Sequence, residues 1–286
     1  MSGGAFGLAL GAAFLHAFWN VLLAGSRDSV AATGALLLFG TALLAPAALL
    51  FGGVSAEAVP FIAASAALEL AYFALLALAY RDGELGVVYP VARGSAPVLV
   101  LAVAALGLGK GVSGLAAVGV VLVAAGVLLV GARGRWGGLW TDMGTESAPP
   151  PGGRRDLAFG LAIGVTIAGY TLVDSEGLDH ADPLPYLFLI TAAVCVVYCG
   201  ALLGTGHGSE LRAELRPRTL LTAAATFGAY AMVLAALQMA PAAPVAAVRE
   251  SSIVIAAFMA WLFLGEERRL TGAALVAAGV AAIAYS

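Results

Sequence analysis

Residues 112–131 read VSGLAAVGVVLVAAGVLLVG, a run of twenty residues without a charged side chain. An α-helix rises 1.5 Å per residue, so the run makes a helix of about 30 Å, the hydrocarbon thickness of a bilayer. In lipid every backbone N–H and C=O must be bonded within the chain, which only helices and closed barrels achieve. The run does not alternate between apolar and polar residues as a barrel strand does. It therefore predicts a transmembrane helix.

Similar runs fill the rest of the 286-residue chain, which is 62% hydrophobic and 11% charged. Soluble domains carry roughly 25% charged residues, so the composition favours a protein that is embedded in membrane lipids. The net charge of −3 argues against a nucleic-acid partner, which needs a basic surface. The other predicted spans cover residues 4–25, 30–51, 59–80, 87–108, 157–178, 184–204, 218–239, 243–264 and 270–285. We expect an all-α, multi-pass protein of the cell membrane with ten transmembrane helices.

The two halves of the chain resemble each other in sequence. Residues 7–11 match 160–164, residues 93–95 match 249–251, residues 106–110 match 262–266, and Gly119 and Gly126 have the spacing of Gly272 and Gly279. Five spans are an odd number, so the second half enters the membrane in the opposite sense to the first. Such inverted repeats are typical of alternating-access transporters. We expect one repeat at 1–131, a Pro-, Gly- and Arg-rich linker at 132–156, and a second repeat at 157–286. Coincidental similarity of low-complexity segments is the alternative.

Several short motifs carry a resemblance to a known family. They are HAFWN at 16–20, AYR at 79–81, YPVARGSAP at 89–97, LGE at 264–266, and the pair Gly272 and Gly279. With them the chain resembles the EamA family of the drug/metabolite transporter superfamily, which implies two five-helix repeats and a transporter, not an enzyme. Lys110 departs from the family, which usually has an acidic residue there, as the second half does at Glu266.

These patterns predict a secondary transporter that moves a small metabolite through a central cavity between the repeats. No phosphate-binding Walker loop is present, so proton coupling or exchange is expected in place of ATP, and no cofactor is expected. A flippase for lipids or lipid-linked substrates is the first alternative. An integral-membrane enzyme is the second, but the scattered histidines and carboxylates form no catalytic set. Substrate, direction and oligomeric state stay open.

The orientation in the membrane is also open. Connections after the odd-numbered spans hold eleven arginines, whereas those after spans 2, 4, 6 and 8 hold only Lys110. The positive-inside rule then places both termini outside the cytoplasm. The family resemblance implies the opposite.

Two arginines are the leading candidates for binding a solute. Arg93 and Arg249 each lie within a span, where an ionisable residue usually faces the bundle interior or water. Prolines near both predict interrupted helices that line a cavity. Each arginine could bind an anionic group of an anion or zwitterion through its forked N–H groups. Alternatively each is permanently neutralised, Arg249 by Glu69.

Other candidate substrate-binding residues lie near these arginines or in other spans. They are Glu250, Ser95, Ser251 and Tyr89 near the arginines, Glu69 and Tyr72 in the third span, His16, Trp19 and Asn20 in the first span, and Tyr170 and Asp174 in the sixth. Glu69 could couple transport to protons or pair with an arginine. For Asn20 we favour hydrogen bonding between helices.

Neither a metal centre nor a disulfide is expected. Asp179, His180 and Asp182 form a loop cluster that is more typical of solvated side chains than of a metal site. Cys195 and Cys199 lie one helical turn apart and are interpreted as packing residues.

Overall fold

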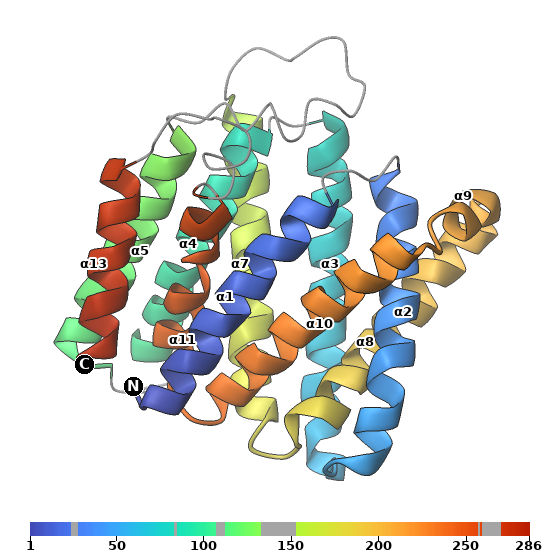
Figure 1. Cartoon of the computed structure of the whole chain (residues 1–286), viewed down its shortest axis with the longest axis horizontal. Helices are drawn as coiled ribbons and strands as arrows, with labels where there is room; N and C mark the ends of the chain where they lie inside the picture. Colours follow the sequence, from blue (N-terminus) through green and yellow to red (C-terminus); the bar gives the residue numbers. More distant parts are fainter. Residues whose placement is uncertain (24–27, 83–84, 107–111, 133–152, 257, 259–269) are drawn as a thin grey trace.

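The computed structural model describes residues 1–23, 28–82, 85–106, 112–132, 153–256, 258 and 270–286, which form helices and short connections. The main helices are α1 (Gly3–Leu23), α2 (Ser29–Leu50), α3 (Val59–Asp82), α4 (Leu85–Leu106), α5 (Gly114–Ala132), α7 (Arg154–Gly177), α8 (Pro183–Gly204), α10 (Pro217–Leu237), α11 (Ala242–Arg249) and α13 (Leu270–Ala284). A 3₁₀ turn (Ala56–Ala58) precedes α3, and the short α9 (Gly208–Ala213) precedes α10. Both termini lie at the same end of the bundle (Figure 1).

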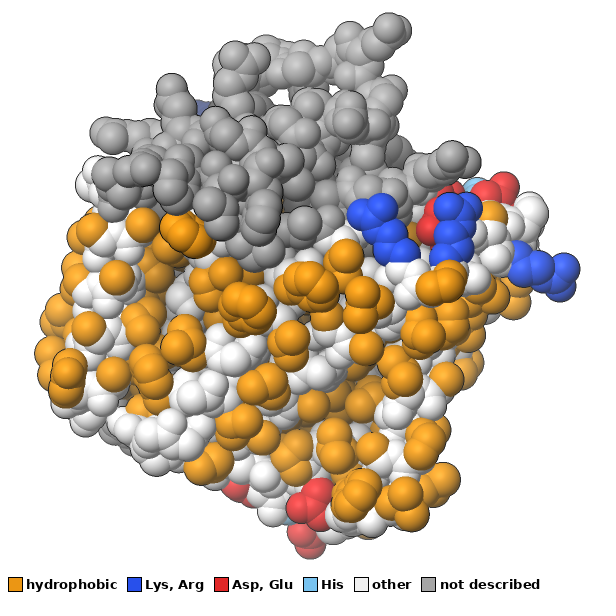
Figure 2. All heavy atoms as spheres, viewed as in Figure 1, with side chains coloured by type: hydrophobic (Ala, Val, Ile, Leu, Met, Phe, Trp, Pro, Cys, Tyr) orange, Lys and Arg blue, Asp and Glu red, His pale blue; other side chains and the backbone are white. Residues whose placement is uncertain are grey.

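Apart from α11, which ends at Arg249 within the predicted span 243–264, the described helices begin and end within a few residues of the predicted spans. Six of them contain windows long and apolar enough to cross a membrane, at Val30–Leu50, Ala56–Leu76, Val87–Leu106, Arg154–Gly177, Pro183–Gly204 and Pro217–Leu237. Shorter apolar helical windows occur at Gly3–Trp19, Gly114–Leu129 and Thr271–Ala284. Figure 2 shows hydrophobic side chains over the flanks of these helices, with arginines gathered beside α9. This distribution suits lipid around the flanks and water at the ends.

The prediction of interrupted arginine-bearing helices is wrong for α4, and in α11 the interruption follows Arg249, whereas Pro241 and Pro244 lie at the start of that helix. α4 continues from Leu85 to Leu106 although Pro90 and Pro97 lie inside it. Neighbouring helices and local adjustment tolerate such prolines in membrane proteins.

The second arginine-bearing helix, α11, ends at Arg249, and helical structure resumes at Ser252. At this interruption Glu250 N and Ser251 N donate to Ala247 O and Val248 O, three residues back. Ser251 Oγ also donates to Val248 O at 2.7 Å, and such local side-chain bonds compete with regular helix bonding.

Helices from the first part of the chain pack mainly against helices from the second part. The largest packed pairs are α5 with α13, α4 with α7, α1 with α10, α3 with α7, and α2 with α8. Smaller contacts join α2 with α10, α3 with α8, and α1 with α11. The two parts are therefore intertwined and do not form separate bundles.

Glycines bring α5 and α13 into close backbone contact. A Cβ atom at Gly126 would lie 2.7 Å from Gly272 O and 2.8 Å from Val276 N. A Cβ at Gly279 would lie 2.6 Å from Gly119 O and 2.8 Å from Val123 N. Real Cβ atoms do not approach backbone this closely, so this pairing requires glycine at both positions, as in other small-residue contacts between membrane helices.

Two connections meet at the end of the bundle that holds the termini. Residues 52–58 follow α2 and residues 178–182 follow α7, and we call their contact the latch. Three hydrogen bonds cross it: Ser55 N to His180 O at 3.0 Å, Asp182 N to Gly53 O at 2.9 Å, and Gly53 N to Asp182 Oδ2 at 2.8 Å.

Side chains add to the latch. His180 Nδ1 lies 3.2 Å from Glu57 Oε2, and the His180 ring stacks on Phe61 with centroids 5.6 Å apart. Gly52 has a φ of +97°, and a Cβ there would lie 2.5 Å from the Asp182 Cβ. The predicted loop cluster thus uses His180 and Asp182 for contacts between connections.

Candidate functional site

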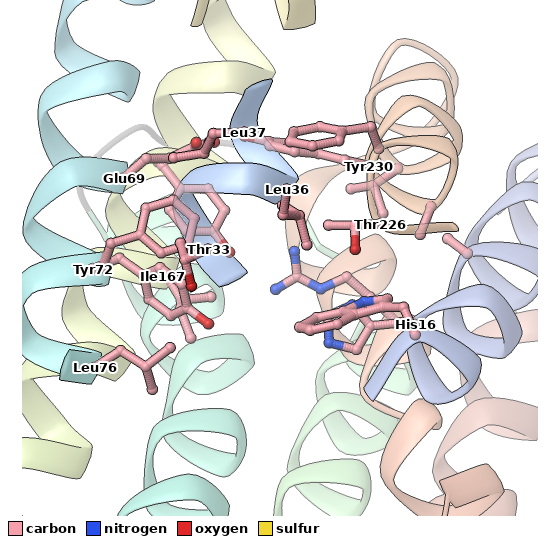
Figure 3. Close-up of a pocket in the computed structure, with 18 of the residues that line it drawn as sticks. His16, Thr33, Leu36, Leu37, Glu69, Tyr72, Leu76, Ile167, Thr226 and Tyr230 are labelled. Carbon is pink, nitrogen blue, oxygen red and sulfur yellow. The ribbon is translucent and has the colours of Figure 1, made fainter. Parts of the chain in front are cut away.

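A cavity lies in the middle of the bundle, surrounded by α1, α2, α3, α4, α7, α10 and α11. Its atom-free space is about 1000 Å³, which includes space open to solvent. The lining is mostly apolar, with a limited set of polar side chains. These are His16, Trp19, Thr33, Glu69, Tyr72, Arg93, Tyr170, Thr226, Tyr230 and Arg249. Figure 3 shows Glu69 and Tyr72 on one side of the cavity and His16 on the other.

The cavity lining reaches toward both ends of the bundle. Trp19 lies four residues before the end of α1, which corresponds to about 6 Å along the helix axis. Glu69 lies ten residues into α3, about 15 Å from the latch end. Val233 lies four residues before the end of α10, about 6 Å along the helix axis, and Gln238, which follows α10, donates to Leu178 O and Ala181 O in the latch.

Arg93 and Arg249 meet through a shared carboxylate. Arg93 Nη1 donates to Glu250 Oε1 at 3.1 Å, and Arg249 Nε and Nη2 donate to the same oxygen at 3.3 Å. All three side chains are buried, Glu250 completely. We call Arg93, Arg249 and Glu250 the arginine pole. Both arginines line the cavity, whereas Glu250 lies outside its lining.

First-span side chains complete this side of the cavity. The His16 Nε2 atom contacts Arg93 Nη2, and Trp19 Nε1–H donates to His16 Nδ1 at 3.1 Å. Tyr89 lies one turn before Arg93 and places its ring 5.4 Å from the guanidinium carbon. The Tyr89 hydroxyl also accepts from Arg93 Nε at 3.4 Å.

The opposite side carries two carboxyl groups. Glu69 lines the cavity, and Asp174 lies behind the lining and interacts with Glu69 electrostatically. Tyr230 Oη donates to Asp174 Oδ2 at 2.6 Å, and Tyr186 Oη donates to Oδ1 at 3.2 Å. Glu69 Oε1 is buried and makes no hydrogen bond to the part of the chain that the structure describes. Buried polar atoms rarely lack partners, so this oxygen is a candidate for contact with a solute or a proton.

Aromatic rings form the wall beside these groups. The Tyr170 ring lies 6.5 Å from that of Tyr72 and 6.2 Å from that of Tyr230, between centroids. Such edge-to-face and tilted pairs stabilise the packing of aromatic rings. The wall gives an apolar surface next to the hydroxyl groups that the three tyrosines supply.

Sequence reasoning identified many of the lining residues. The cavity includes His16, Trp19, Glu69, Tyr72, Arg93, Tyr170 and Arg249 from the predicted set. The suggested neutralisation of Arg249 by Glu69 is wrong, because Arg249 bonds to Glu250, its neighbour in sequence at the helix interruption.

Other predicted residues lie away from the cavity surface. Ser95 Oγ donates to Ala92 O, and Ser251 Oγ donates to Val248 O, so both hydroxyls bond to their own backbone. Tyr89, Asp174 and Glu250 contact lining residues from behind. The side chain of Asn20 lies outside the described residues.

Sequence reasoning missed the contributions of α2 and α10. Thr33, Thr226 and Tyr230 line the cavity, and Tyr230 also bonds to Asp174. The position of Tyr230 in the middle of an apolar span was an available signal, because a buried tyrosine hydroxyl usually requires a partner.

Comparisons with known proteins agree with this picture. A solved chain described as "Crystal structure of protein" is similar to this one with a TM-score of 0.69 and 16% sequence identity, over 99% of each chain. At this identity the likeness establishes the fold alone. No curated protein matches the sequence. Residues 156–286 match the model of the EamA-like transporter family, whose members are membrane transporters.

The family match and the apolar helices together identify a multi-pass membrane protein and confirm the resemblance that the motifs suggested. Residues 156–286 thus resemble the EamA-like transporter family of the drug/metabolite transporter superfamily.

Proposed function

We propose that this protein is a secondary transporter for a small zwitterionic or anionic metabolite in the cell membrane. The observation that carries the proposal is the central cavity, with Arg93 and Arg249 on its lining and the Glu69 carboxyl group across from His16. A solute with a carboxylate and an ammonium group would place its carboxylate against the arginines and its ammonium group against Glu69. Its apolar part would contact the tyrosine wall.

The arginines suit an acidic group because of their geometry. Arg249 uses Nε and Nη2 for Glu250, and its Nη1 atom makes no hydrogen bond within the described part of the chain. A guanidinium presents its N–H groups in a planar fork that matches a carboxylate, and buried charge-assisted bonds of this kind are strong. His16 and Trp19 would contact the same end of the solute.

We further propose ten spans in two inverted repeats, 1–131 and 157–286, joined by the linker 132–156. In the proposed repeats α1, α2 and α3 correspond to α7, α8 and α10. The contact of α1 with α10 then corresponds to that of α7 with α3, and the contact of α2 with α10 corresponds to that of α8 with α3. With α4 corresponding to α11, the contact of α4 with α7 corresponds to that of α11 with α1. An internal two-fold axis produces such reciprocal contacts.

Individual atoms in the α5–α13 contact support the same symmetry. An offset of 153 residues relates Gly126 to Gly279, Gly119 to Gly272, and Val123 to Val276. Gly126 faces Gly272 O and Val276 N, and Gly279 faces Gly119 O and Val123 N. Each environment is the image of the other under exchange of the repeats.

Alternating access would then open each end of the cavity in turn. In the described state the latch is formed at one end, and the cavity lies in the middle of the bundle. Glu69, whose Oε1 atom has no protein partner among the described residues, would take up either a proton or the ammonium group of the solute. Competition between these two cations at one carboxylate would couple transport to protons or to solute exchange.

Thermal unfolding of the purified protein with a metabolite panel tests this proposal. The panel contains anions, zwitterions, cations and neutral compounds in equal number. A ligand at a hundred times its dissociation constant stabilises a protein by about 2.7 kcal/mol, which is readily measured. Anions or zwitterions should stabilise the wild type but neither Arg93→Ala nor Arg249→Ala. Arg212→Ala, on the exposed surface of α9, is the control that should respond like the wild type.

Two results would contradict the proposal. One is stabilisation by cations or apolar compounds alone, with both arginine variants responding like the wild type. The other is full transport of an identified anion by Arg249→Lys, which keeps the charge but lacks the fork and would refute the geometric part of the argument.

A further inference from the structure

Glu250 is the least exposed member of the arginine pole, with an exposed fraction of 0%. It follows Arg249 directly, at the point where α11 ends, so its backbone leaves the regular helix. This position lets one carboxylate oxygen reach guanidinium groups from two different helices, α4 and the end of α11. The other oxygen, Oε2, is buried and has no hydrogen-bond partner in the described residues.

The charge of the pole follows from its members. Arg93 and Arg249 each carry a positive charge, because arginine stays protonated in proteins. Glu250 accepts three N–H bonds from the two guanidinium groups through one oxygen and is their shared carboxylate partner. Two positive charges and one negative charge leave one positive charge uncompensated.

Neighbouring side chains leave this charge in place. His16 lies against Arg93 and Trp19, and a second positive charge next to a buried guanidinium is unfavourable, so the imidazole adds no charge to the pole. Tyr89 contributes a hydroxyl group and a ring face to Arg93, without a charge of its own. The carboxyl group of Glu69 lies on the side of the cavity across from His16. Asp174 interacts with Arg249 electrostatically, but its oxygens accept from Tyr230 and Tyr186, and the arginines form their ion pairs with Glu250 among the described residues.

We infer that Glu250 sets the charge selectivity of the carrier: by neutralising one of the two cavity arginines, it limits the acidic group of the solute to a single negative charge. This inference rests on the proposed function of the arginines as the anion-binding side. A monoanionic group, such as a carboxylate or sulfonate, brings the buried pole to neutrality. A dianionic group, such as a phosphonate or phosphate ester, leaves an excess buried negative charge, which is strongly unfavourable in a low dielectric.

Glu250 acts through the arginines as a positioning residue. It contacts the guanidinium groups from outside the cavity lining and so leaves their opposite edges available to the solute. Without it, two like charges would face each other across the pole, and the site would suit two negative charges.

Matched probes can separate charge from shape. Aminoalkanesulfonates and aminoalkylphosphonates with one to three methylene groups have the same tetrahedral head. At pH 8 the sulfonate carries one negative charge, and the phosphonate, like a phosphate whose second pKa is about 6, carries nearly two. Their dissociation constants are measured by thermal shift and by competition with any substrate that the metabolite panel identifies. The variants are Glu250→Gln, Glu250→Asp, Arg249→Ala and the double variant Arg93→Gln/Glu250→Gln.

The wild type should bind sulfonates at least tenfold more tightly than the matched phosphonates. Glu250→Gln should shift this ratio by at least tenfold toward phosphonates, and Glu250→Asp, which keeps the charge, should retain the wild-type preference. The double variant has one uncompensated arginine again, so its preference for sulfonates should return even if Glu250→Gln alone folds poorly.

Two outcomes would overturn the inference, and they differ in what they imply. If the ratio in Glu250→Gln stays at the wild-type value, or if the ratio in the double variant stays at the Glu250→Gln value, while Arg249→Ala weakens the binding of both probes, then the role of Glu250 is refuted but the arginine site is kept. Failure of every probe to bind the wild type and the variants refutes both the inference and the anion-binding side of the proposed function.

Discussion

Substitution of alanine at Gly126 or at Gly279 tests the internal symmetry of the fold. Both glycines press against backbone atoms of the partner helix, and the added Cβ would lie 2.7 Å from a carbonyl oxygen at Gly126 and 2.6 Å at Gly279. Backbone cannot rotate away as a flexible side chain can, so α5 and α13 must separate to admit the methyl group.

The expected loss of stability is the difference between two effects. Inserting a methyl group into a close-packed contact typically costs about 1–3 kcal/mol. Alanine favours a helix over glycine by up to about 1 kcal/mol, which offsets part of this cost. We therefore expect each variant to lose about 1–2 kcal/mol of unfolding free energy. Because the two environments are images of each other, the two losses should be nearly equal.

Equilibrium unfolding in mixed micelles, followed by far-UV circular dichroism, measures these free energies. Gly200→Ala is the matched control, because Gly200 lies within α8 and no atom lies within 4 Å of its added Cβ. This variant should be neutral or slightly more stable than the wild type. The reasoning fails if Gly126→Ala is as stable as Gly200→Ala, or if the losses at the two symmetric positions differ by more than about 1 kcal/mol.

Three further predictions concern the cavity and the latch. Tyr230→Phe removes the hydroxyl that donates to Asp174 at 2.6 Å. Because this bond is charge-assisted, its loss should lower the unfolding free energy by about 1.5–3 kcal/mol. An unchanged melting temperature would show that the bond contributes little to stability. In the wild type, uptake of a zwitterion should decrease as the pH falls, since protonation of Glu69 removes the charge that attracts the ammonium group. Glu69→Gln should flatten this pH profile. If the variant keeps the wild-type profile, Glu69 is not the group that makes uptake depend on pH. Gly52→Ala should disrupt the latch, because the φ of +97° at Gly52 and the short distance from Gly52 to Asp182 both exclude a side chain. The variant should have a lower melting temperature and a higher rate of solute exchange than the wild type. Gly53→Ala, where a Cβ meets no atom within 4 Å, is the control that should leave both unchanged.

The helical ranges were predictable because lipid imposes a strict rule on the sequence. A spanning helix must be long and apolar, so runs such as residues 112–131 indicate their own boundaries. The interruption after Arg249 was predictable in kind, since prolines and serines gather there, but the sequence could not tell that α4 tolerates Pro90 and Pro97. That outcome depends on how neighbouring helices support the backbone.

The candidate site was only partly predictable, for a similar reason. Buried charge in an apolar span is rare, so Arg93, Arg249 and Glu69 stand out without knowledge of the fold. Which carboxylate faces which arginine depends on helix rotation and on distances between helices, and here Glu250 took the place expected for Glu69. The position of Tyr230 in an apolar span indicated that its hydroxyl needs a partner, but the sequence did not show which helix supplies that partner.

The latch has a consequence for the speed of the carrier. Its three hydrogen bonds join the connection after α2 to the connection after α7, so they must break whenever that end opens, whichever solute is bound. At about 1 kcal/mol of net free energy for each bond, they add about 3 kcal/mol to the barrier if they are broken in the transition state, roughly a hundredfold in rate. The latch would raise this barrier equally for the transporter without solute and for the transporter with bound solute. In the proposed transport cycle, a stable latch would therefore lower the rate of opening at that end and reduce uncoupled passage of solute. The residues of the two connections would then set the rate of transport.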